Sequence, residues 1–224
     1  MTARLDAAFR EVIGRDIQKF VFIFAAENNY IMKDMMKDLG ARAFNYGYAS
    51  PVLMVATYND DGSVNVMNLH ECTRTNAGHL ALCIGKPKKT HENIEKRGAF
   101  TLTLATKEMM AEVDYMGTVS GYRVPDKFEK AGMKAVKSDL VDAPIIVGSK
   151  VVLECEVIEF VDIPNFNCIV ARVVNLKADE SVLGANSKID TSKIGMIFYE
   201  SFNNQYFSLG EKAGNAWVEG RKFM

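Results

Sequence analysis

The chain has 224 residues, of which 48% are hydrophobic, so it is long enough to bury the core of one domain of ordinary size. Its net charge of -1 and pI near 6.3 exclude the overall basic character expected of a nucleic-acid-binding protein. The 4 cysteines form no CxxC pair and the 3 histidines form no HExxH motif. The sequence therefore predicts no metal site and no disulfide framework, and it favours reduced thiols in a cytoplasmic protein.

The first predicted element is an N-terminal helical extension over residues 1–35, ahead of a domain spanning 36–224. Apolar side chains recur at helical intervals from Leu5 to Phe24, with charged residues between them. This pattern predicts an amphipathic helix that docks on another surface. The apolar run at 20–26 is too short to cross a bilayer, and acidic residues precede it, so neither a membrane span nor a signal peptide is predicted. Methionines near the end of the extension leave open where the natural start lies.

From Pro51 onward the chain has the pattern of strands. The segments PVLMVATY and VNVMNL flank the turn-rich stretch NDDGS and together predict a β-hairpin. Further strands are predicted at 79–85, 99–105, 150–163, 167–179, 195–200 and 205–210, and short helices at 90–98, 107–117 and 125–132. Many strands, few helices and no regular βαβ alternation favour a mainly β barrel with peripheral helices.

Positive charge is concentrated where strand 79–85 passes into the next helix. Lys86, Lys88 and Lys89 precede Thr90, which stands at the expected N-cap, and Gly98 stands at the expected C′ position. Because the N-terminus of a helix is itself positive, this arrangement could hold a bound anion such as a terminal phosphate. The alternative is that Thr90 only caps the helix and the lysines form a solvated turn. Neither a P-loop nor a GxGxxG motif is present.

A family resemblance extends over most of the chain. It is carried by the segments 36–69, 84–100, 112–132, 141–146, 153–159 and 206–217. In their order and spacing these segments are similar to the flavin reductase-like family of FMN-binding split-barrel proteins, which includes flavoredoxin. The resemblance implies a mainly β fold, an antiparallel Greek-key split barrel with peripheral helices.

The resemblance also implies a set of cofactor-binding residues. NVMNL is similar to the segment lining the flavin ring, CIG to the strand beside it, KKT to the phosphate-binding segment, and DKF to a segment bearing a second phosphate-directed lysine. The implied residues are Asn65, Met67, Asn68, Leu69, Cys83, Ile84, Gly85, Lys88, Lys89, Thr90 and Lys127. The alternatives are core packing for Met67 and Leu69, a packed thiol for Cys83, and a surface helix position for Lys127.

The implied function is electron transfer from NADH or NADPH through bound FMN to free flavin or a redox protein partner. No catalytic side chain is then required, because the flavin carries the chemistry. One alternative is a flavoredoxin-type electron carrier with little NAD(P)H activity. Another is a non-catalytic barrel that binds heme or a different cofactor. The resemblance implies a homodimer, and no nucleic acid or membrane is expected as a partner.

Several positions depart from the family pattern or stay open. Glu71 stands where many relatives have an aromatic residue, and Pro87 where they often have serine, which leaves the second substrate undefined. His70 is either a structural histidine or a hydrogen-bond partner of the flavin or nicotinamide. The segment 114–121, with its glycines, predicts a loop over the flavin or a helix stop with a tight turn. Trp217 is placed either at a subunit contact or in the core.

Overall fold

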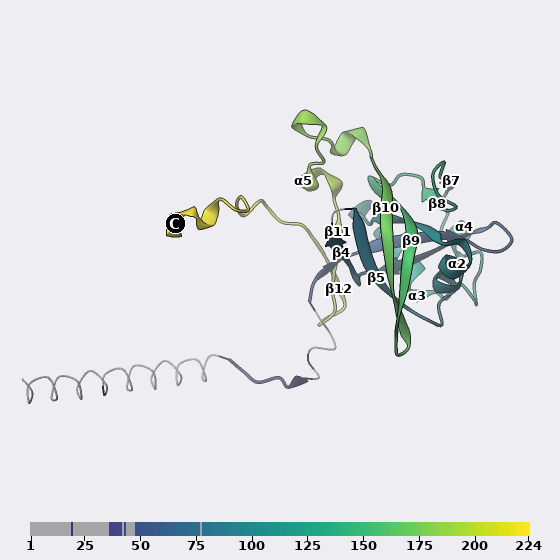
Figure 1. Cartoon of the computed structure of the whole chain (residues 1–224), viewed down its shortest axis with the longest axis horizontal. Helices are drawn as coiled ribbons and strands as arrows, with labels where there is room; N and C mark the ends of the chain where they lie inside the picture. Colours follow the sequence, from purple (N-terminus) through teal and green to yellow (C-terminus); the bar gives the residue numbers. More distant parts are fainter. Residues whose placement is uncertain (1–18, 20–35, 42, 44–47, 77) are drawn as a thin grey trace, which may run out of the picture. The chain divides into compact units, whose positions relative to one another are not determined.

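The computed structural model describes residues 19, 36–41, 43, 48–76 and 78–224 (Figure 1). The chain divides into two units, Met1–Tyr46 and Gly47–Met224, and the second holds every element discussed below. The predicted helical extension lies, apart from Lys19, outside the described residues. Its existence and the domain boundary after residue 35 therefore stay predictions.

A seven-stranded antiparallel sheet forms the body of the second unit. Its order is β3 (Val64–Leu69), β2 (Leu53–Tyr58), β6 (Ala99–Leu104), β9 (Val151–Ile163), β10 (Phe166–Ala178), β5 (His79–Gly85) and β4 (Cys72–Asn76). The edge strands β3 and β4 are separated in sequence only by His70 and Glu71. The sheet must therefore curl until its two edges approach each other, which produces the predicted barrel.

Smaller elements surround this sheet (Figure 1). A three-stranded sheet contains β1 (Ser50–Pro51), β11 (Ile197–Glu200) and β12 (Gln205–Ser208), and β7 (Ala135–Lys137) pairs with β8 (Pro144–Ile146). The α-helices are α2 (Lys89–Arg97), α3 (Met110–Thr118), α4 (Lys127–Lys130) and α5 (Thr191–Ile194). Single 3-10 turns occur at Lys107–Met109, Glu180–Val182, Ala185–Ser187 and Glu219–Phe223.

The predicted strands form, and β2 pairs with β3 as the predicted hairpin, in a register that opposes Leu53 to Leu69. The sequence analysis missed β4, β7, β8 and α5. The sequence of β4, CTRTN, is polar and mostly exposed at the sheet edge, so it lacks the apolar alternation that identifies a strand. The other missed elements are 3 or 4 residues long, too short to show a period.

Two layers of apolar side chains meet at β2, whose first five residues are all buried. Leu53 and Val55 face the barrel interior, where they pack with Phe100 and Ile169. The alternate residues of β2 face a second cluster, in which α3 and α4 contribute Val113, Met116 and Phe128. Each fully buried side chain of this size stabilises the fold by about 1.5–3 kcal/mol. Burial on both faces explains why β2 is almost continuously apolar.

The remaining sequence predictions concern cysteines, metals and Trp217. All four cysteines are free. Among the described residues, no group of His, Cys, Asp and Glu side chains is arranged to hold a metal ion. Nor is any helix in that part of the chain long and apolar enough to cross a membrane. Trp217 is 94% exposed, so the core position considered for it is wrong.

Candidate cofactor-binding site

The site is built around the start of α2. Lys88 is the N-cap residue in an extended conformation (φ -118°, ψ 135°), and no side chain of the described residues caps the helix. The N–H groups of the first turn therefore lack a side-chain partner. At the other end Gly98 adopts φ 64°, and its N–H donates to the carbonyl oxygen of Ile94 at 2.8 Å. This confirms the predicted C′ glycine.

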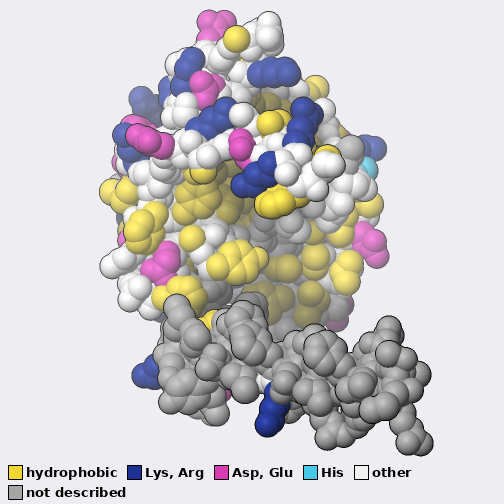
Figure 2. All heavy atoms as spheres, turned by 90° about the vertical axis from the view of Figure 1, so that its left-hand side faces the viewer, with side chains coloured by type: hydrophobic (Ala, Val, Ile, Leu, Met, Phe, Trp, Pro, Cys, Tyr) yellow, Lys and Arg dark blue, Asp and Glu magenta, His cyan; other side chains and the backbone are white. Residues whose placement is uncertain are grey.

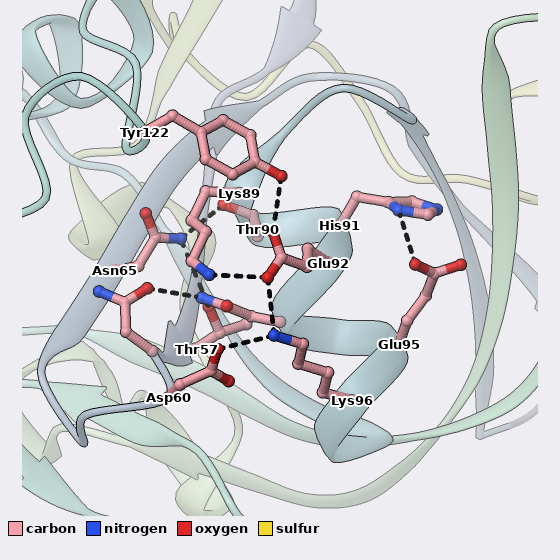
Figure 3. Close-up of polar contacts among 12 residues, drawn as sticks. Thr57, Asp60, Asn65, Lys89, Thr90, His91, Glu92, Glu95, Lys96 and Tyr122 are labelled. Atoms are coloured by element: carbon pink, nitrogen blue, oxygen red, sulfur yellow. Dashed lines mark hydrogen bonds and ion pairs between the residues drawn. The ribbon is translucent and has the colours of Figure 1, made fainter.

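Thr90 does not cap the helix, so that part of the sequence interpretation is wrong. It is the second residue of α2 and is 2% exposed. Its hydroxyl accepts a hydrogen bond from Asn65 Nδ2 on β3 at 2.7 Å (Figure 3). This bond holds the threonine side chain inward against the sheet, away from the position of a cap.

A buried polar network fixes the start of α2 on the β2–β3 hairpin (Figure 3). Besides its bond to Thr90, Asn65 Nδ2 lies 3.4 Å from Thr57 Oγ1. Asn93, one turn further along α2, donates from Nδ2 to Thr57 Oγ1 at 3.1 Å and to Asn59 Oδ1 at 2.9 Å. Buried networks of this kind hold a backbone in one position. The free N–H groups of the helix start are therefore held rigidly.

A cavity of about 210 Å³ opens at this helix start. It is lined by Asn65, Met67, Asn68, Lys88, Lys89, Thr90, Lys127 and the segment 116–121. The structure thus brings together predicted residues from β3, from the start of α2 and from α4. Lys88 is exposed and Lys89 is half-buried, and both line this cavity.

The other four predicted residues do not line the cavity. Leu69 and Ile84 are 4% and 1% exposed and belong to the barrel interior, which is the core-packing alternative for Leu69. Cys83 and Gly85 lie on β5, and Cys83 faces away from that interior because its neighbours Leu82 and Ile84 face into it. No contact with the cavity supports a role for these four in its wall.

Glu92 supplies the negative charge that offsets Lys89 (Figure 3). Its carboxylate accepts hydrogen bonds from Lys96 Nζ at 2.7 Å, Lys89 Nζ at 2.9 Å and Tyr122 Oη at 2.8 Å. Together these donors, Lys96 first, lower the pKa of Glu92 to about 2. The contact with Tyr122 also connects the segment after α3 to α2.

We expect Glu92→Gln to strengthen the binding of a phosphate ligand in the cavity. The substitution removes the carboxylate that competes for Lys89, and exposed ion pairs of this kind are worth about 0.2–1 kcal/mol, or roughly 1.5- to 5-fold in Kd. The measurement is calorimetric titration with FMN at pH 7. Glu95→Gln removes the same charge one turn away, where the carboxylate faces His91 Nδ1 at 3.4 Å, and serves as the matched control. Equal changes in the two variants would indicate only a general field effect.

Lys127 enters the cavity wall from α4 as a buried side chain, 2% exposed, so the surface alternative is wrong. Its Nζ donates to the carbonyl oxygens of Met116 and Val119, both at 2.8 Å. These carbonyls stand at the C-terminal end of α3, where a helix favours a cation. Burial, and then the charge of Lys88, lower the pKa of Lys127 to about 8.

Two glycines let the segment 116–121 approach β3 closely. A Cβ atom on Gly117 would lie 2.2 Å from Asn68 Nδ2. One on Gly121 would lie 2.5 Å from Asn65 Oδ1 and 3.2 Å from Lys89 Cβ. The sequence analysis predicted a loop or a helix stop here, and the segment is the end of α3 followed by a turn that forms one wall of the cavity. The sequence analysis named no individual residue of this segment as part of the site.

Gly121→Ala is expected to destabilise the fold by about 1–3 kcal/mol, the usual range for a group forced into a packed site. Asn65 cannot turn away easily, because it is buried and bonded to Thr90. Urea unfolding followed by circular dichroism measures the effect. Gly210→Ala is the control, since a Cβ at that position meets no atom of the described residues within 4 Å. A free energy of unfolding equal to that of the control would show that segment 116–121 shifts to accommodate the added methyl group without loss of stability.

A second cavity of about 310 Å³ adjoins the first, with Asn68, Gly117 and Thr118 in both walls. Two aromatic side chains line it, Tyr199 from β11 and Tyr206 from β12. The centroid of the Tyr199 ring lies 4.9 Å from the centroid of the His70 ring, and His70 also lines this cavity.

The two carboxylates near the second cavity, those of Asp114 and Glu71, each have a polar partner. Tyr206 donates from Oη to Asp114 Oδ1 at 2.9 Å, and burial followed by this carboxylate raises the pKa of Tyr206 to about 12. Glu71 is exposed and lies 3.0 Å from His70 Nδ1. The departure at Glu71 therefore carries no cost of burying a carboxylate.

The curled antiparallel sheet with its peripheral helices places the chain among the split-barrel proteins. Within that class the chain belongs to the flavin reductase-like family, because the family model described as "Flavin reductase like domain" matches residues 45–202. The fold and the family resemblance seen in the sequence are both confirmed.

Two solved structures agree with this assignment, and part of the chain is also similar to a curated protein. The flavoredoxin of Desulfovibrio vulgaris (Miyazaki F) is similar at 26% identity and a TM-score of 0.77, over 83% of this chain and 100% of that one. The flavoredoxin from Methanosarcina acetivorans is similar at 26% identity and a TM-score of 0.75, over 84% and 99%. A protein of Archaeoglobus fulgidus is 30% identical over 97 residues, 43% of this chain. The match spans about half of that relative, 54% of its length.

Proposed function

We propose that this protein binds FMN and transfers electrons from NADH or NADPH through the bound flavin to free flavin or to a redox protein partner. The observation that carries the proposal is the cavity at the start of α2, where Lys88, Lys89 and Lys127 meet an uncapped helix N-terminus. Family membership supports a flavin as the ligand class.

The residues present fit the phosphate of FMN. A phosphate monoester carries close to two negative charges at neutral pH and accepts several hydrogen bonds. Three ammonium groups and the first-turn N–H groups of α2 provide donors of the required sign. The adjoining cavity, with Tyr199 and Tyr206 in its wall, offers apolar and aromatic surface for a planar ring system.

The chain itself has a binding and positioning role in this mechanism. FMN, when bound, supplies the acceptor for a hydride and the means to pass electrons on. Lys88, Lys89 and Lys127 hold the phosphate end of the cofactor. Asn68, whose Nδ2 donates to the carbonyl oxygen of Val113 at 3.2 Å, stands at the junction of the two cavities and orients the rest of the molecule. No side chain of the chain is assigned as a proton donor or acceptor.

A second candidate is a flavoredoxin-type carrier with little NAD(P)H activity, which the similarity to two flavoredoxins at 26% identity favours. The absorption spectrum of the freshly purified protein, followed by anaerobic titration with NADH, separates the candidates. A flavin spectrum that bleaches rapidly with NADH supports the reductase. A flavin spectrum that bleaches slowly with NADH but rapidly with a reduced iron–sulfur protein supports the carrier. A heme spectrum, or indifference to FMN, supports the non-catalytic cofactor-binding barrel.

We further propose a homodimer in the cytoplasm. Large hydrophobic side chains are exposed around the tip of the β9–β10 hairpin, among them Phe160, Val161, Ile163 and Phe166. Figure 2 shows hydrophobic side chains gathered on the face that it draws, below a region rich in lysine and arginine. Free cysteines support a reducing compartment. Sedimentation velocity on the full chain, and on one beginning at Met36, tests the dimer and the contribution of the N-terminal extension.

A further inference from the structure

Cys83 on β5 and Cys168 on β10 stand directly opposite each other in the antiparallel sheet. Their sequence neighbours, Leu82 and Ile169 among them, point into the barrel interior. Because side chains alternate along a strand, both cysteines point to the other face. Both are half-buried there, so the pair is within reach of small solutes.

Backbone hydrogen bonds identify the kind of cross-strand pair that the two cysteines form. The N–H of Cys83 donates to the carbonyl oxygen of Glu71, on the side of β5 away from β10, at 2.9 Å. The N–H of Lys86 donates toward the β10 side, to the carbonyl oxygen of Asn165, at 3.1 Å. Since bonded and non-bonded pairs alternate, both observations make Cys83 and Cys168 a non-hydrogen-bonded pair.

This geometry suits a covalent bond between the two thiols. In non-hydrogen-bonded pairs the Cα atoms are about 4.5 Å apart and the side chains are at their closest. A disulfide requires Cα atoms at roughly 4.4–6.8 Å, so the strands need little movement. Burial, and then the neighbouring thiol of Cys168, raise the pKa of Cys83. The reactive thiolate is therefore scarce at neutral pH, and the reaction is expected to accelerate as the pH rises.

We propose that Cys83 and Cys168 form a reversible redox site, in which a low-molecular-weight disulfide oxidises the two thiols to one cross-strand disulfide. One thiolate attacks the external disulfide RSSR, forms a mixed disulfide and releases one RSH. The second thiol then displaces the other RSH. The two protein thiols lose two protons and two electrons in total, and RSSR takes them up to become 2 RSH.

The remaining cysteines provide the contrast. Cys72 on β4 lies opposite Leu82 on β5, so its side chain is on the interior face of the sheet, as that of Leu82 is. Cys155 is fully buried in the same interior cluster. Burial raises the pKa of Cys72 to about 11 and that of Cys155 to about 12. Neither is expected to react under conditions that oxidise the outer pair.

The test is to treat the full-length protein with oxidised glutathione at pH 8, block free thiols with N-ethylmaleimide, and map peptides without reduction. We expect the peptides containing Cys83 and Cys168 to be joined, with the loss of two hydrogens, and dithiothreitol to reverse the link. Cys72→Ala should retain the linked peptide and Cys83→Ala should abolish it. Three outcomes overturn the inference in the wild-type protein. They are a disulfide between two chains, a persistent mixed disulfide with glutathione, or two free thiols under conditions that oxidise a reference dithiol.

Discussion

Replacing Lys89 with alanine is expected to weaken FMN binding by about 1–3 kcal/mol, which is roughly a 5- to 150-fold rise in Kd. Lys89 lines the cavity at the start of α2, and its side chain is only 16% exposed, so its charge is less screened than that of a surface lysine. The fold should be little affected, because within the described part of the chain the ammonium group contacts only Glu92 and the ring of Tyr122. Fluorescence titration of FMN gives Kd, and thermal unfolding gives the stability.

Lys86→Ala is the matched control for this experiment. Lys86 stands three residues earlier in the same lysine cluster, but it pairs with Asp162 and does not line the cavity. Its removal tests whether local positive charge alone attracts FMN. Equal losses of FMN affinity in the two variants would show that general positive charge attracts FMN and that Lys89 makes no specific contact with it. If FMN bound at full strength after Lys89→Ala and Thr90→Ala were combined, the phosphate would have to bind elsewhere.

The second large effect concerns pH and Lys127. Its pKa of about 8 lies below the ordinary lysine value of 10.5, so the ammonium is charged below pH 8 and neutral well above it. The phosphate of FMN is already a dianion above pH 7. FMN affinity is therefore expected to fall as the pH rises through and beyond 8, by at most about tenfold per pH unit for one proton. Lys127→Met should bind more weakly at pH 7 and lack this decline.

Protein stability should change with pH in the opposite direction. Between about pH 8 and the ordinary lysine pKa, the unfolded chain holds a proton on Lys127 that the folded chain has lost. The state that binds more protons is favoured at low pH, so the contribution of Lys127 to the free energy of unfolding rises with pH across this window. Without FMN, urea unfolding at several pH values should show that the free energy of unfolding of the wild type, minus that of Lys127→Met, rises with pH across this window.

A purely structural role for Lys127 makes a different prediction. Its Nζ bonds two carbonyl oxygens at the end of α3, and leaving them without a donor costs about 1–3 kcal/mol of stability. In that case Lys127→Met would lower the unfolding temperature but leave the pH dependence of FMN binding unchanged. Lys130→Met is the control on the same helix, because Lys130 is exposed and pairs with Asp126 at 2.9 Å. It should change neither property appreciably.

Local sequence patterns predicted most of the barrel. β-branched alternation identified β9 and β10, the NDDGS turn identified the β2–β3 hairpin, and Gly98 identified the end of α2. These features depend on residues close together in the chain, and their physical causes are local. The short polar strand β4 was missed because an exposed edge strand needs no apolar period.

The candidate site was predicted only in part. Family resemblance pointed to Lys88, Lys89, Thr90 and Lys127, and the structure places all four at one cavity. It did not show that Thr90 is bonded to Asn65, because that contact joins positions 25 residues apart. Nor did it show the wall formed by segment 116–121, which depends on the absence of side chains at two glycines.

The sequence by itself determined where the longer strands form and where positive charge collects beside a helix start. Only the tertiary structure decided which side chains share a cavity. The register of β3 and β5 turns Leu69 and Ile84 into the barrel, while α3 and α4 bring Lys127 to the lysines of α2. The physical reason is that strand and helix periods act over a few residues. The face that a residue presents, and the distant groups it meets, depend on how the whole sheet pairs and curls.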